Sequence, residues 1–373
     1  MIYLFIICSL LYIINNINKE QQKISITDKI KYDIYDQIKN NILNIKSRLN
    51  NKTKFGIVIK NGYPIIRLIS NMFGINAIYE LALYIEPLVD IFYVGNIFDG
   101  RNLRKYSIKK PIMVLYLIEP NYIPIAEKYD LQIIIPNKTY IDLIIPIIKH
   151  KINIHLWYDS GLGKEGFNDY KKLINLYMEI EKIPQLKLIG IGTKYNTKYK
   201  STTNIIPPDI KIQHETFKKI IKIINNPQLI FHTACSFEVK NNYSESYFDS
   251  VRVGTLIYNN IKWTQLILDT KLMKDSDCYG YKCENTIINN SIINNNSIIN
   301  NNTINNNSNI DRIFILGLIK NYLQLDSRKY SYLKITKDKT NLRIVFNGYD
   351  PIGIEVNNKI NVGSTVELIY NII

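Results

Sequence analysis

Cysteine is scarce in this chain of 373 residues, and the few cysteines present do not form a known pattern. They are Cys8, Cys235, Cys278 and Cys283, and only the last two lie close together. Their spacing is not a familiar zinc spacing, and no matching second pair occurs. So few cysteines also argue against a disulfide framework. We therefore expect a reducing compartment, with the cytoplasm as the default.

The chain also lacks an apolar run of full membrane-spanning length. Residues 1–14 are almost wholly apolar, but a spanning helix needs about 20 such residues. No basic stretch precedes this run and no clear cleavage site follows it, as a signal peptide would require. We treat residues 1–26 as a separate N-terminal segment. Three roles remain open for this segment: packing on the body of the protein, weak membrane association through residues 1–14, or directing secretion.

Dense basic clusters are missing as well, although the formal net charge is +15. The lysines are spread along the chain, which favours a solvated basic surface over a specific nucleic-acid site. The usage is skewed towards Ile, Asn, Lys and Tyr, which are residues of AT-rich codons. Part of the positive charge therefore reflects genome composition, and we expect no specific nucleic-acid partner.

No Gly-x-Gly-x-x-Gly motif follows the first strand, so a dinucleotide-binding fold lacks its fingerprint. Instead, short apolar runs alternate with stretches of helical length over residues 27–258, as expected for strands buried on both faces of a parallel sheet. This pattern predicts an α/β fold, a (β/α)8 TIM-type barrel, with a doubly wound open sheet as the alternative. The predicted strands are 55–59, 91–94, 112–116, 132–135, 152–156, 186–191, 229–232 and 251–254.

Helical periodicity fades after about residue 259, and strand-like segments follow. We predict a small, mainly-β domain over residues 259–373. Residues 286–309 inside it are near-repeats of Ser-Ile-Ile-Asn-Asn-Asn without charge, which predicts a disordered insertion. The predicted strands are 264–273, 312–319, 342–346, 352–356 and 364–370.

Three features could carry chemistry. Lys60 ends the first predicted strand, where barrel side chains point into the active-site mouth. Its amine could form a Schiff base there, although a lysine that merely begins a solvated loop is the alternative. Three glycines after Asp159 predict a tight turn with free backbone N–H groups. Arg252 on a late strand suits phosphate or carboxylate binding, whereas His232 is interpreted as a core histidine with satisfied hydrogen bonds.

These stretches occur in the order and context of the alanine racemase family. Val58-Ile-Lys60 resembles the motif of the family's first strand. Residues 155–166, His-Leu-Trp-Tyr-Asp-Ser-Gly-Leu-Gly-Lys-Glu-Gly, are similar to its Asp-Thr-Gly-Met-Gly-Arg-x-Gly motif. Residues 232–236, His-Thr-Ala-Cys-Ser, resemble His-x-Ala-Asn-Ser, and residues 248–258 resemble Phe-Asp-x-Val-Arg-Pro-Gly-x-x-x-Tyr. The resemblance covers about residues 27–258 and is less secure beyond them.

The resemblance implies a pyridoxal 5′-phosphate (PLP)-dependent amino-acid racemase, with alanine as the first candidate substrate. Lys60 would carry PLP and act as one catalytic base, and Tyr279 would be the second. In the family this tyrosine comes from the partner subunit, which implies a homodimer with shared active sites. The other residues implied are Tyr63, Ser236, Arg252, Gly254 and Thr255 for the cofactor and Lys164 and Asp350 for the substrate, with no metal.

Four positions near these residues depart from the family pattern. Lys164 replaces an arginine, and Trp157 stands where many members have a carbamylated lysine. Lys194 replaces a histidine, and Cys235 replaces an asparagine. Changes around a site commonly weaken its function. The alternatives are therefore a catalytically impaired PLP-binding homologue or a serine racemase of the same fold.

Overall fold

The computed structural model describes the backbone of residues 26–197 and 206–266 and of separate strands between 269 and 370. Side chains are described over residues 28–197 and 206–262. The chain forms two compact units, one centred on residues 38–260 and the other on residues 261–320 and 334–369 together with the N-terminal part. The boundary near residue 260 is close to the one expected at 259, while the other boundary falls inside the first described helix.

The unit centred on residues 38–260 is a closed barrel of parallel strands in chain order, because β8 pairs with β1. This confirms the predicted (β/α)8 barrel and shows that the open-sheet alternative is wrong. Each predicted apolar run coincides with a strand. The strands are β1 (Lys54–Ile59), β2 (Ile91–Val94), β3 (Ile112–Val114), β4 (Leu131–Ile135), β5 (Ile152–Tyr158), β6 (Leu186–Thr193), β7 (Ile230–Cys235) and β8 (Ser250–Val253).

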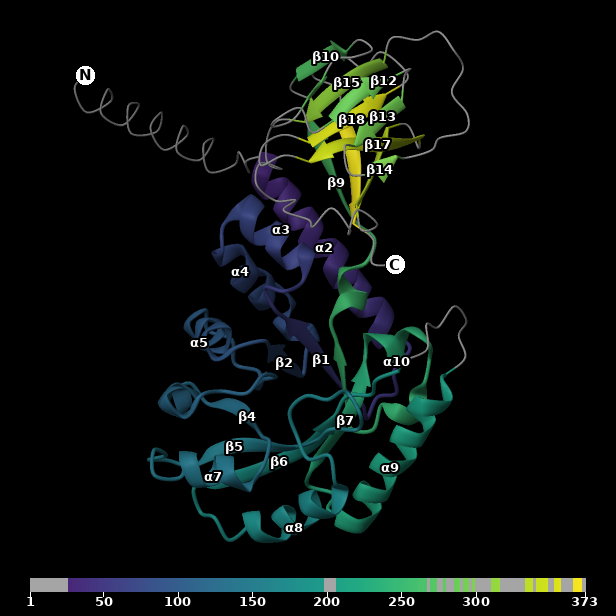
Figure 1. Ribbon diagram of the computed structural model, residues 1–373. Helices are drawn as coiled ribbons and strands as arrows, with labels where there is room; N and C mark the ends of the chain where they lie inside the picture. The colour runs from purple at the N-terminus through teal and green to yellow at the C-terminus, as the bar shows by residue number, and fades with distance from the viewer. Residues whose placement is uncertain are drawn as a thin grey trace, which may run out of the picture. The chain divides into compact units, whose positions relative to one another are not determined.

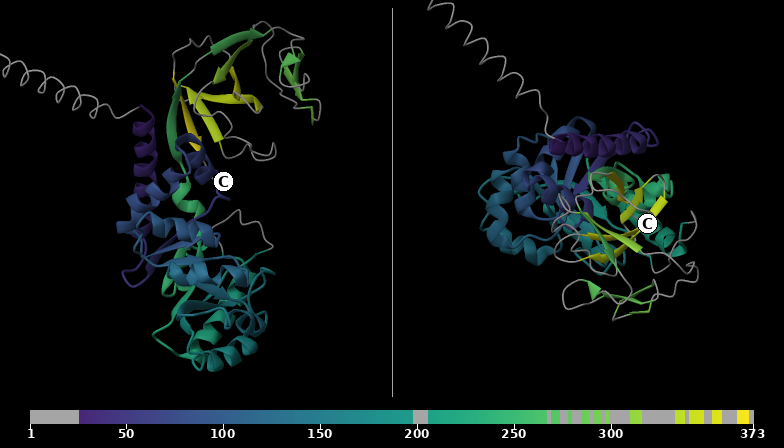
Figure 2. Two further views of the ribbon diagram at one scale, coloured as in Figure 1. Left: turned by 90° about the vertical axis from the view of Figure 1, so that its left-hand side faces the viewer. Right: turned by 90° about the horizontal axis from the view of Figure 1, so that it is seen from above.

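Helices follow the strands and lie on the outer side of the barrel (Figures 1 and 2). The α-helices are α2 (Ile26–Lys46), α3 (Pro64–Phe73), α4 (Asn76–Ile85), α5 (Ile97–Lys105), α6 (Ile123–Lys128), α7 (Lys138–Ile144), α8 (Tyr170–Ile180), α9 (Pro208–Ile224) and α10 (Ser236–Lys240). Short 3-10 helices are η1 (Glu86–Leu88), η2 (Pro120–Tyr122), η3 (Ser244–Ser246) and η4 (Thr255–Tyr258).

Local sequence explains why these elements form. The residues of β2, β3, β4 and β8 are buried throughout, which requires the apolar runs seen in the sequence. In α8, Leu173, Leu176 and Ile180 are buried at helical spacing, so one stripe of the helix packs on the barrel. The side chains of Asn96 and Asn137 accept hydrogen bonds from backbone N–H groups at the starts of α5 and α7. Such caps fix where a helix begins.

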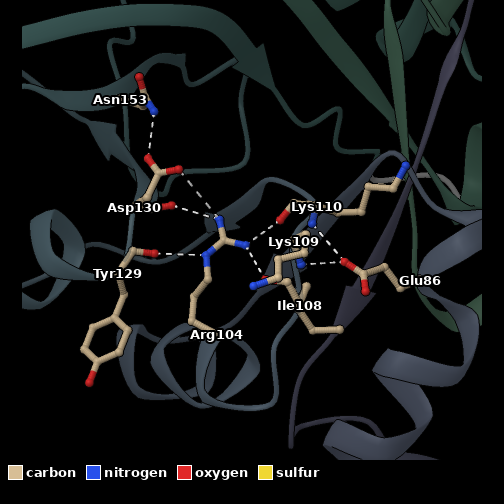
Figure 3. Close-up of polar contacts among 8 residues, drawn as sticks. All are labelled: Glu86, Arg104, Ile108, Lys109, Lys110, Tyr129, Asp130 and Asn153. Carbon is tan, nitrogen blue, oxygen red and sulfur yellow. Dashed lines mark hydrogen bonds and ion pairs between the residues drawn. The ribbon is translucent and has the colours of Figure 1, made fainter.

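The Arg104 side chain is hydrogen-bonded to the backbone of two turns, at the end of the barrel where β3 and β4 begin (Figure 3). Its Nε donates to the carbonyl of Tyr129 at 3.0 Å. Its terminal nitrogens donate to the carbonyls of Ile108, Lys110 and Asp130 at 2.8, 2.7 and 3.1 Å. One guanidinium thus satisfies four carbonyls that would otherwise lack partners. This end lies opposite Lys60, so the cluster supports the fold rather than the site.

The second unit contains antiparallel sheets. One has seven strands in the order β10-β15-β18-β17-β16-β19-β9, and the other is β11-β12-β13-β14. Their bounds are β9 (Ile261–Leu266), β10 (Asp269–Met273), β11 (Cys278–Tyr279), β12 (Asn285–Ile288), β13 (Ser291–Asn294), β14 (Ser297–Ile298), β15 (Ile310–Ile315), β16 (Leu333–Lys337), β17 (Thr340–Asn347), β18 (Ile352–Val356) and β19 (Thr365–Tyr370). Strands therefore occur in each of the segments predicted to be extended.

Part of the segment predicted to be a disordered insertion, residues 286–309, lies in described strands. Strands β12, β13 and β14 pair in that segment, because paired isoleucines favour an extended backbone. Residues 299–309 lie outside the described residues, as do residues 1–25 of the N-terminal segment. Among the described helices, none alone is long and apolar enough to cross a membrane. The bent pair Pro64–Phe73 and Asn76–Leu88 meets that test by length and composition.

Candidate active site

The mouth of the barrel, at the carboxyl ends of its strands, gathers most of the residues predicted to form the site. Lys60 follows β1, and Ser236 begins α10 directly after β7. Arg252 lies in β8, and Gly254 and Thr255 come just after it. In barrels of this kind the active site lies at this end. Barrel closure therefore places β7, β8 and β1 next to one another with their functional side chains.

Lys60 is half-buried among aromatic rings. Its Nζ lies 4.8 Å from the centre of the Tyr63 ring and 3.4 Å from the hydroxyl of Tyr116. Tyr63 in turn packs against Tyr258, with ring centres 5.6 Å apart. Burial raises the pKa of Tyr63, so its hydroxyl stays protonated and can donate a hydrogen bond. The amine is therefore held at the rim rather than extended into solvent.

A small polar cradle lies beside Tyr63. The hydroxyl oxygen of Ser236 accepts hydrogen bonds from the backbone N–H groups of Gly254 at 2.9 Å and Leu256 at 3.3 Å. A Cβ atom at Gly254 would overlap the Tyr63 hydroxyl, so only glycine allows this close approach. A phosphate group bound at the start of η4 would take the place of the Ser236 oxygen as the acceptor of these N–H groups.

Arg252 is a buried positive charge, with only 4% of its surface exposed. One terminal nitrogen donates to the His232 carbonyl at 2.9 Å and to the His232 imidazole. The other donates to the carbonyls of Thr193 at 2.5 Å and Thr233 at 2.9 Å. Trp157 packs against the guanidinium, with the Arg252 Cζ 5.1 Å from the centre of the Trp157 ring. These bonds occupy both terminal nitrogens, so Nε–H is the donor available to a ligand.

Among the described residues no carboxylate forms an ion pair with Arg252. The buried Glu238 carboxylate acts on the guanidinium from a greater distance and works against the lowering of the Arg252 pKa by burial. Carbonyl oxygens and an aromatic face compensate the charge of Arg252 only in part, because they carry no net charge. A buried cation of this kind favours the binding of an anion nearby. The site therefore suits a ligand that brings negative charge, such as a phosphate ester.

A chain of buried hydrogen bonds runs from Arg252 across the barrel. The His232 Nε2 lies 3.0 Å from His155 Nδ1, and the His155 Nε2 lies 2.9 Å from the Gln132 side-chain oxygen. Since Arg252 can only donate, His232 must accept at Nδ1 and donate at Nε2. By the same logic His155 donates to Gln132. Both imidazoles are therefore neutral, with defined tautomers.

Burial and the Arg252 charge keep these imidazoles neutral. They lower the pKa of His155 to about 3 and that of His232 well below its usual value. The interpretation of His232 as a satisfied core histidine is therefore confirmed. The sequence analysis did not identify His155 and Gln132 as members of this hydrogen-bond chain. A single polar residue in an apolar strand forms no spacing pattern that would reveal its partner. Trp157, expected only as a departure from a family pattern, packs against both Arg252 and His232.

In the glycine turn after β5 the N–H groups of Gly161 and Gly163 are not free, contrary to the expectation. The carboxylate of Asp159 accepts from the N–H groups of Gly161, Leu162 and Gly163 at 3.1, 2.8 and 3.1 Å. An aspartate at the start of such a turn competes for these donors. The turn instead presents Lys164, an exposed side chain whose Nζ lies 5.7 Å from the centre of the Tyr116 ring.

Lys194 and Cys235 are the two other residues that depart from the family pattern. Lys194 is exposed, and it is not among the hydrogen-bond partners of Arg252. Cys235 is a free cysteine that precedes α10, and its backbone N–H donates to Glu238 at 2.7 Å. Burial of the sulfur and the nearby Glu238 raise the pKa of the Cys235 thiol to about 12. A thiol that stays protonated is a poor nucleophile, so Cys235 is a packing residue here.

Two predicted residues are not brought to this site by the described structure. Tyr279 lies in β11 of the second unit, where only the backbone is described. Asp350 lies outside the described residues. Within the described part of the chain, no group of three or more His, Cys, Asp or Glu side chains could hold a metal ion. The site is thus built from Lys60, the cradle and Arg252, with Lys164 at the rim.

The chain is similar to proteins named alanine racemase. It is 25% identical to that of Clostridium kluyveri over 238 residues, which cover 62% of this chain and 57% of the relative. It is 28% identical to that of Treponema denticola over 230 residues, or 60% and 57% of the two chains. The chain thus spans just over half the length of these relatives.

Solved structures agree on the fold. The alanine racemase of Clostridium difficile matches with a TM-score of 0.66 and 18% identity, covering 90% of this chain and 84% of that one. A Bacillus anthracis structure, described with bound L-Ala-P, matches with a TM-score of 0.66 and 19% identity over 89% and 83%. The model of the alanine racemase N-terminal domain matches residues 35–260. With most of the chain matched, from before β1 to the end of the barrel, this protein belongs to the alanine racemase N-terminal domain family.

Proposed function

We propose that this protein is a PLP-dependent amino-acid racemase that interconverts L- and D-alanine. One observation carries the proposal. Lys60 follows β1 and lies against Tyr63, which borders the Ser236–Gly254 cradle, at the same mouth as the buried charge of Arg252. An amine, a cradle of backbone N–H groups around a serine hydroxyl, and a buried cation fit the aldehyde, phosphate and ring of PLP.

Each residue would have a separate task in holding the cofactor. Lys60 would bind it covalently through Nζ, and Ser236, Gly254, Thr255 and the protonated hydroxyl of Tyr63 would hold its phosphate. Arg252 would contact the ring nitrogen through Nε–H. When bound, PLP supplies an electron sink that makes the α-proton of an amino acid acidic. The side chains around the cofactor then determine which bond of the amino acid breaks and which group takes up the proton.

The charge state of Arg252 bears on that choice. Although burial lowers its pKa, a guanidinium remains protonated under all ordinary conditions. It therefore cannot hand a proton to the ring nitrogen, and its fixed charge disfavours protonation of that nitrogen. A weaker electron sink favours return of the proton to the α-carbon over side reactions such as transamination. The neutral His232 beneath it supports this role, because a protonated imidazole would repel the guanidinium.

Racemisation needs proton transfer on both faces of the α-carbon. Lys60 would act on one face through Nζ, and Tyr279 would act on the other through its hydroxyl. Following the family resemblance, we propose that Tyr279 comes from a second copy of the chain in a homodimer. Lys164 and Asp350 would contact the substrate, with the Lys164 ammonium facing its carboxylate. The scarcity of cysteine favours the cytoplasm as the compartment.

The cofactor is tested by chemical trapping. We expect the purified full chain, treated with PLP and then borohydride, to carry the cofactor mass on the peptide that contains Lys60. Lys60→Arg should abolish this label, whereas Lys54→Arg, at the other end of β1, should leave it unchanged. A label spread over surface lysines, or one that survives in Lys60→Arg, would exclude this site.

The reaction is tested by isotope exchange. In D₂O we expect both L- and D-alanine to yield the opposite enantiomer with solvent deuterium at the α-carbon. Tyr279→Phe should remove interconversion in both directions, while one enantiomer can still exchange its α-proton for deuterium through Lys60. Tyr281→Phe serves as the neighbouring control. Trapping at Lys60 without any deuterium incorporation would contradict racemisation while leaving cofactor binding intact.

A further inference from the structure

Tyr116 is a second aromatic residue at the mouth of the barrel that none of the roles above includes. It lies just after β3, and its hydroxyl accepts a hydrogen bond from the Lys60 Nζ at 3.4 Å. The centre of its ring lies 5.8 Å from Lys60 Nζ and 5.7 Å from Lys164 Nζ. One phenol therefore touches both the amine that would bind the cofactor and the cation that would face the substrate carboxylate.

A glycine on the intervening strand end makes room for this arrangement. Gly95 follows β2, between Lys60 after β1 and Tyr116 after β3. A Cβ atom at Gly95 would lie 3.3 Å from the Lys60 Cβ and 3.5 Å from the Tyr116 ring. A side chain larger than one methyl group would therefore push the ring and the lysine apart. Glycine here leaves room for both the Lys60 side chain and the Tyr116 ring.

Tyr116 is shared by the two lysines, and Lys60 also contacts the Tyr63 ring. In the described part of the chain, neither Lys60 nor Lys164 forms a salt bridge. Long amine side chains without partners sample many rotamers. A ring face attracts an ammonium group through its quadrupole, and a hydroxyl adds direction. A single residue can thus restrict both amines without neutralising either.

We propose that Tyr116 is a positioning residue that aligns Lys60 and Lys164 across the mouth of the barrel. This inference rests on the proposed function. The substrate nitrogen must approach the Lys60 amine, and its carboxylate must approach the Lys164 ammonium. The hydroxyl of Tyr116 orients Lys60, and its ring holds Lys164. The two contacts come from different parts of the side chain, so substitutions can separate them.

The experiment compares Tyr116→Phe, Tyr116→Leu and Leu117→Ala with the wild type. Leu117 is the matched control, because its side chain is 46% exposed and that of Tyr116 is 43% exposed. The first readout is the rate at which PLP is trapped on Lys60 by borohydride, which needs no catalytic activity. We expect this rate to fall about fivefold in Tyr116→Phe and to be unchanged in Leu117→Ala, as the loss of one hydrogen bond predicts.

The second readout is the division between kcat and KM for alanine. Tyr116→Phe keeps the ring and should lower kcat about fivefold while KM stays within about twofold. Tyr116→Leu also removes the ring face, so KM should rise by a further two- to fivefold, about the range of an exposed cation–π contact. Thermal unfolding of each variant would identify one that is misfolded, in which case the phenylalanine variant carries the test.

The outcomes separate this inference from the proposed function. Failure of the wild type to trap PLP on Lys60 would overturn both. Normal trapping in the wild type and an equal rate in Tyr116→Phe would overturn the positioning role alone. A parallel change of kcat and KM in both Tyr116 variants and in Leu117→Ala would also overturn it, because a general structural effect would then explain the data.

Discussion

Acid should destabilise this protein through the histidines buried inside the barrel. The pKa of His155 falls to about 3 because the ring is buried and the Arg252 charge lies nearby. In the unfolded chain the same imidazole would titrate near pH 6.5. Between these two values the unfolded state binds a proton that the folded state excludes. The part of the free energy of unfolding that depends on His155 should therefore be fully present above about pH 6.5. It should decrease as the pH falls towards about 3.

The size of the effect follows from the distance below the unfolded pKa. Each pH unit corresponds to about 1.4 kcal/mol for one such group. At about pH 5, His155 alone should lower the free energy of unfolding by about 2 kcal/mol relative to neutral pH. His232 acts in the same direction, since its pKa is also well below the usual value. Against a typical total of about 5–15 kcal/mol, such a loss is easily measured.

Urea unfolding followed by circular dichroism at about pH 7 and about pH 5 would measure the loss. His155→Gln is the informative variant, because an amide can accept from His232 and donate to Gln132 without titrating. We expect it to lose about 2 kcal/mol less than the wild type between the two pH values. His150→Gln, at an exposed position, should behave like the wild type. An equal loss in His155→Gln would refute the reasoning.

Two further predictions concern stability at neutral pH. Gly166→Ala should cost about 2 kcal/mol, because Gly166 has a φ of 114° and a Cβ would lie 2.5 Å from the carbonyl oxygen of Trp157. Gly62→Ala, with no atom near the added Cβ, should leave urea unfolding nearly unchanged; equal effects would contradict the steric argument. Gln132→Leu should cost about 1–3 kcal/mol by leaving the His155 Nε2–H without an acceptor, whereas Gln132→Glu keeps an acceptor. Equal melting temperatures for the two would argue against the hydrogen-bond chain.

The sequence by itself determined the barrel and the place of its lysine. A strand buried on both faces needs an uninterrupted apolar run, and each such run in residues 54–253 coincides with a strand. Because the run before Lys60 ends where β1 ends, the sequence also placed that amine at the mouth. These features depend on neighbours along the chain, so a linear pattern records them.

Two segments show that a local sequence pattern does not identify the partners of backbone groups. The uncharged repeats of residues 286–309 predicted disorder, yet part of the segment pairs as β12, β13 and β14. Pairing supplies partners for backbone groups that composition alone leaves unaccounted for. The glycines after β5 predicted free N–H groups, but the Asp159 carboxylate occupies those of Gly161 and Gly163, together with that of Leu162. A side chain that turns back on its own loop cannot be read from glycine spacing.

Only the tertiary structure decided which buried side chains inside the barrel are hydrogen-bonded to one another. Gln132, His155, His232 and Arg252 come from β4, β5, β7 and β8, separated by as many as 120 residues, yet they form one chain of hydrogen bonds. Tyr116 and Lys164 meet at the mouth in the same way. Each of these residues looks isolated in its own strand or loop. Closure of the sheet turns their side chains towards a common axis, and no pattern within one segment contains that information.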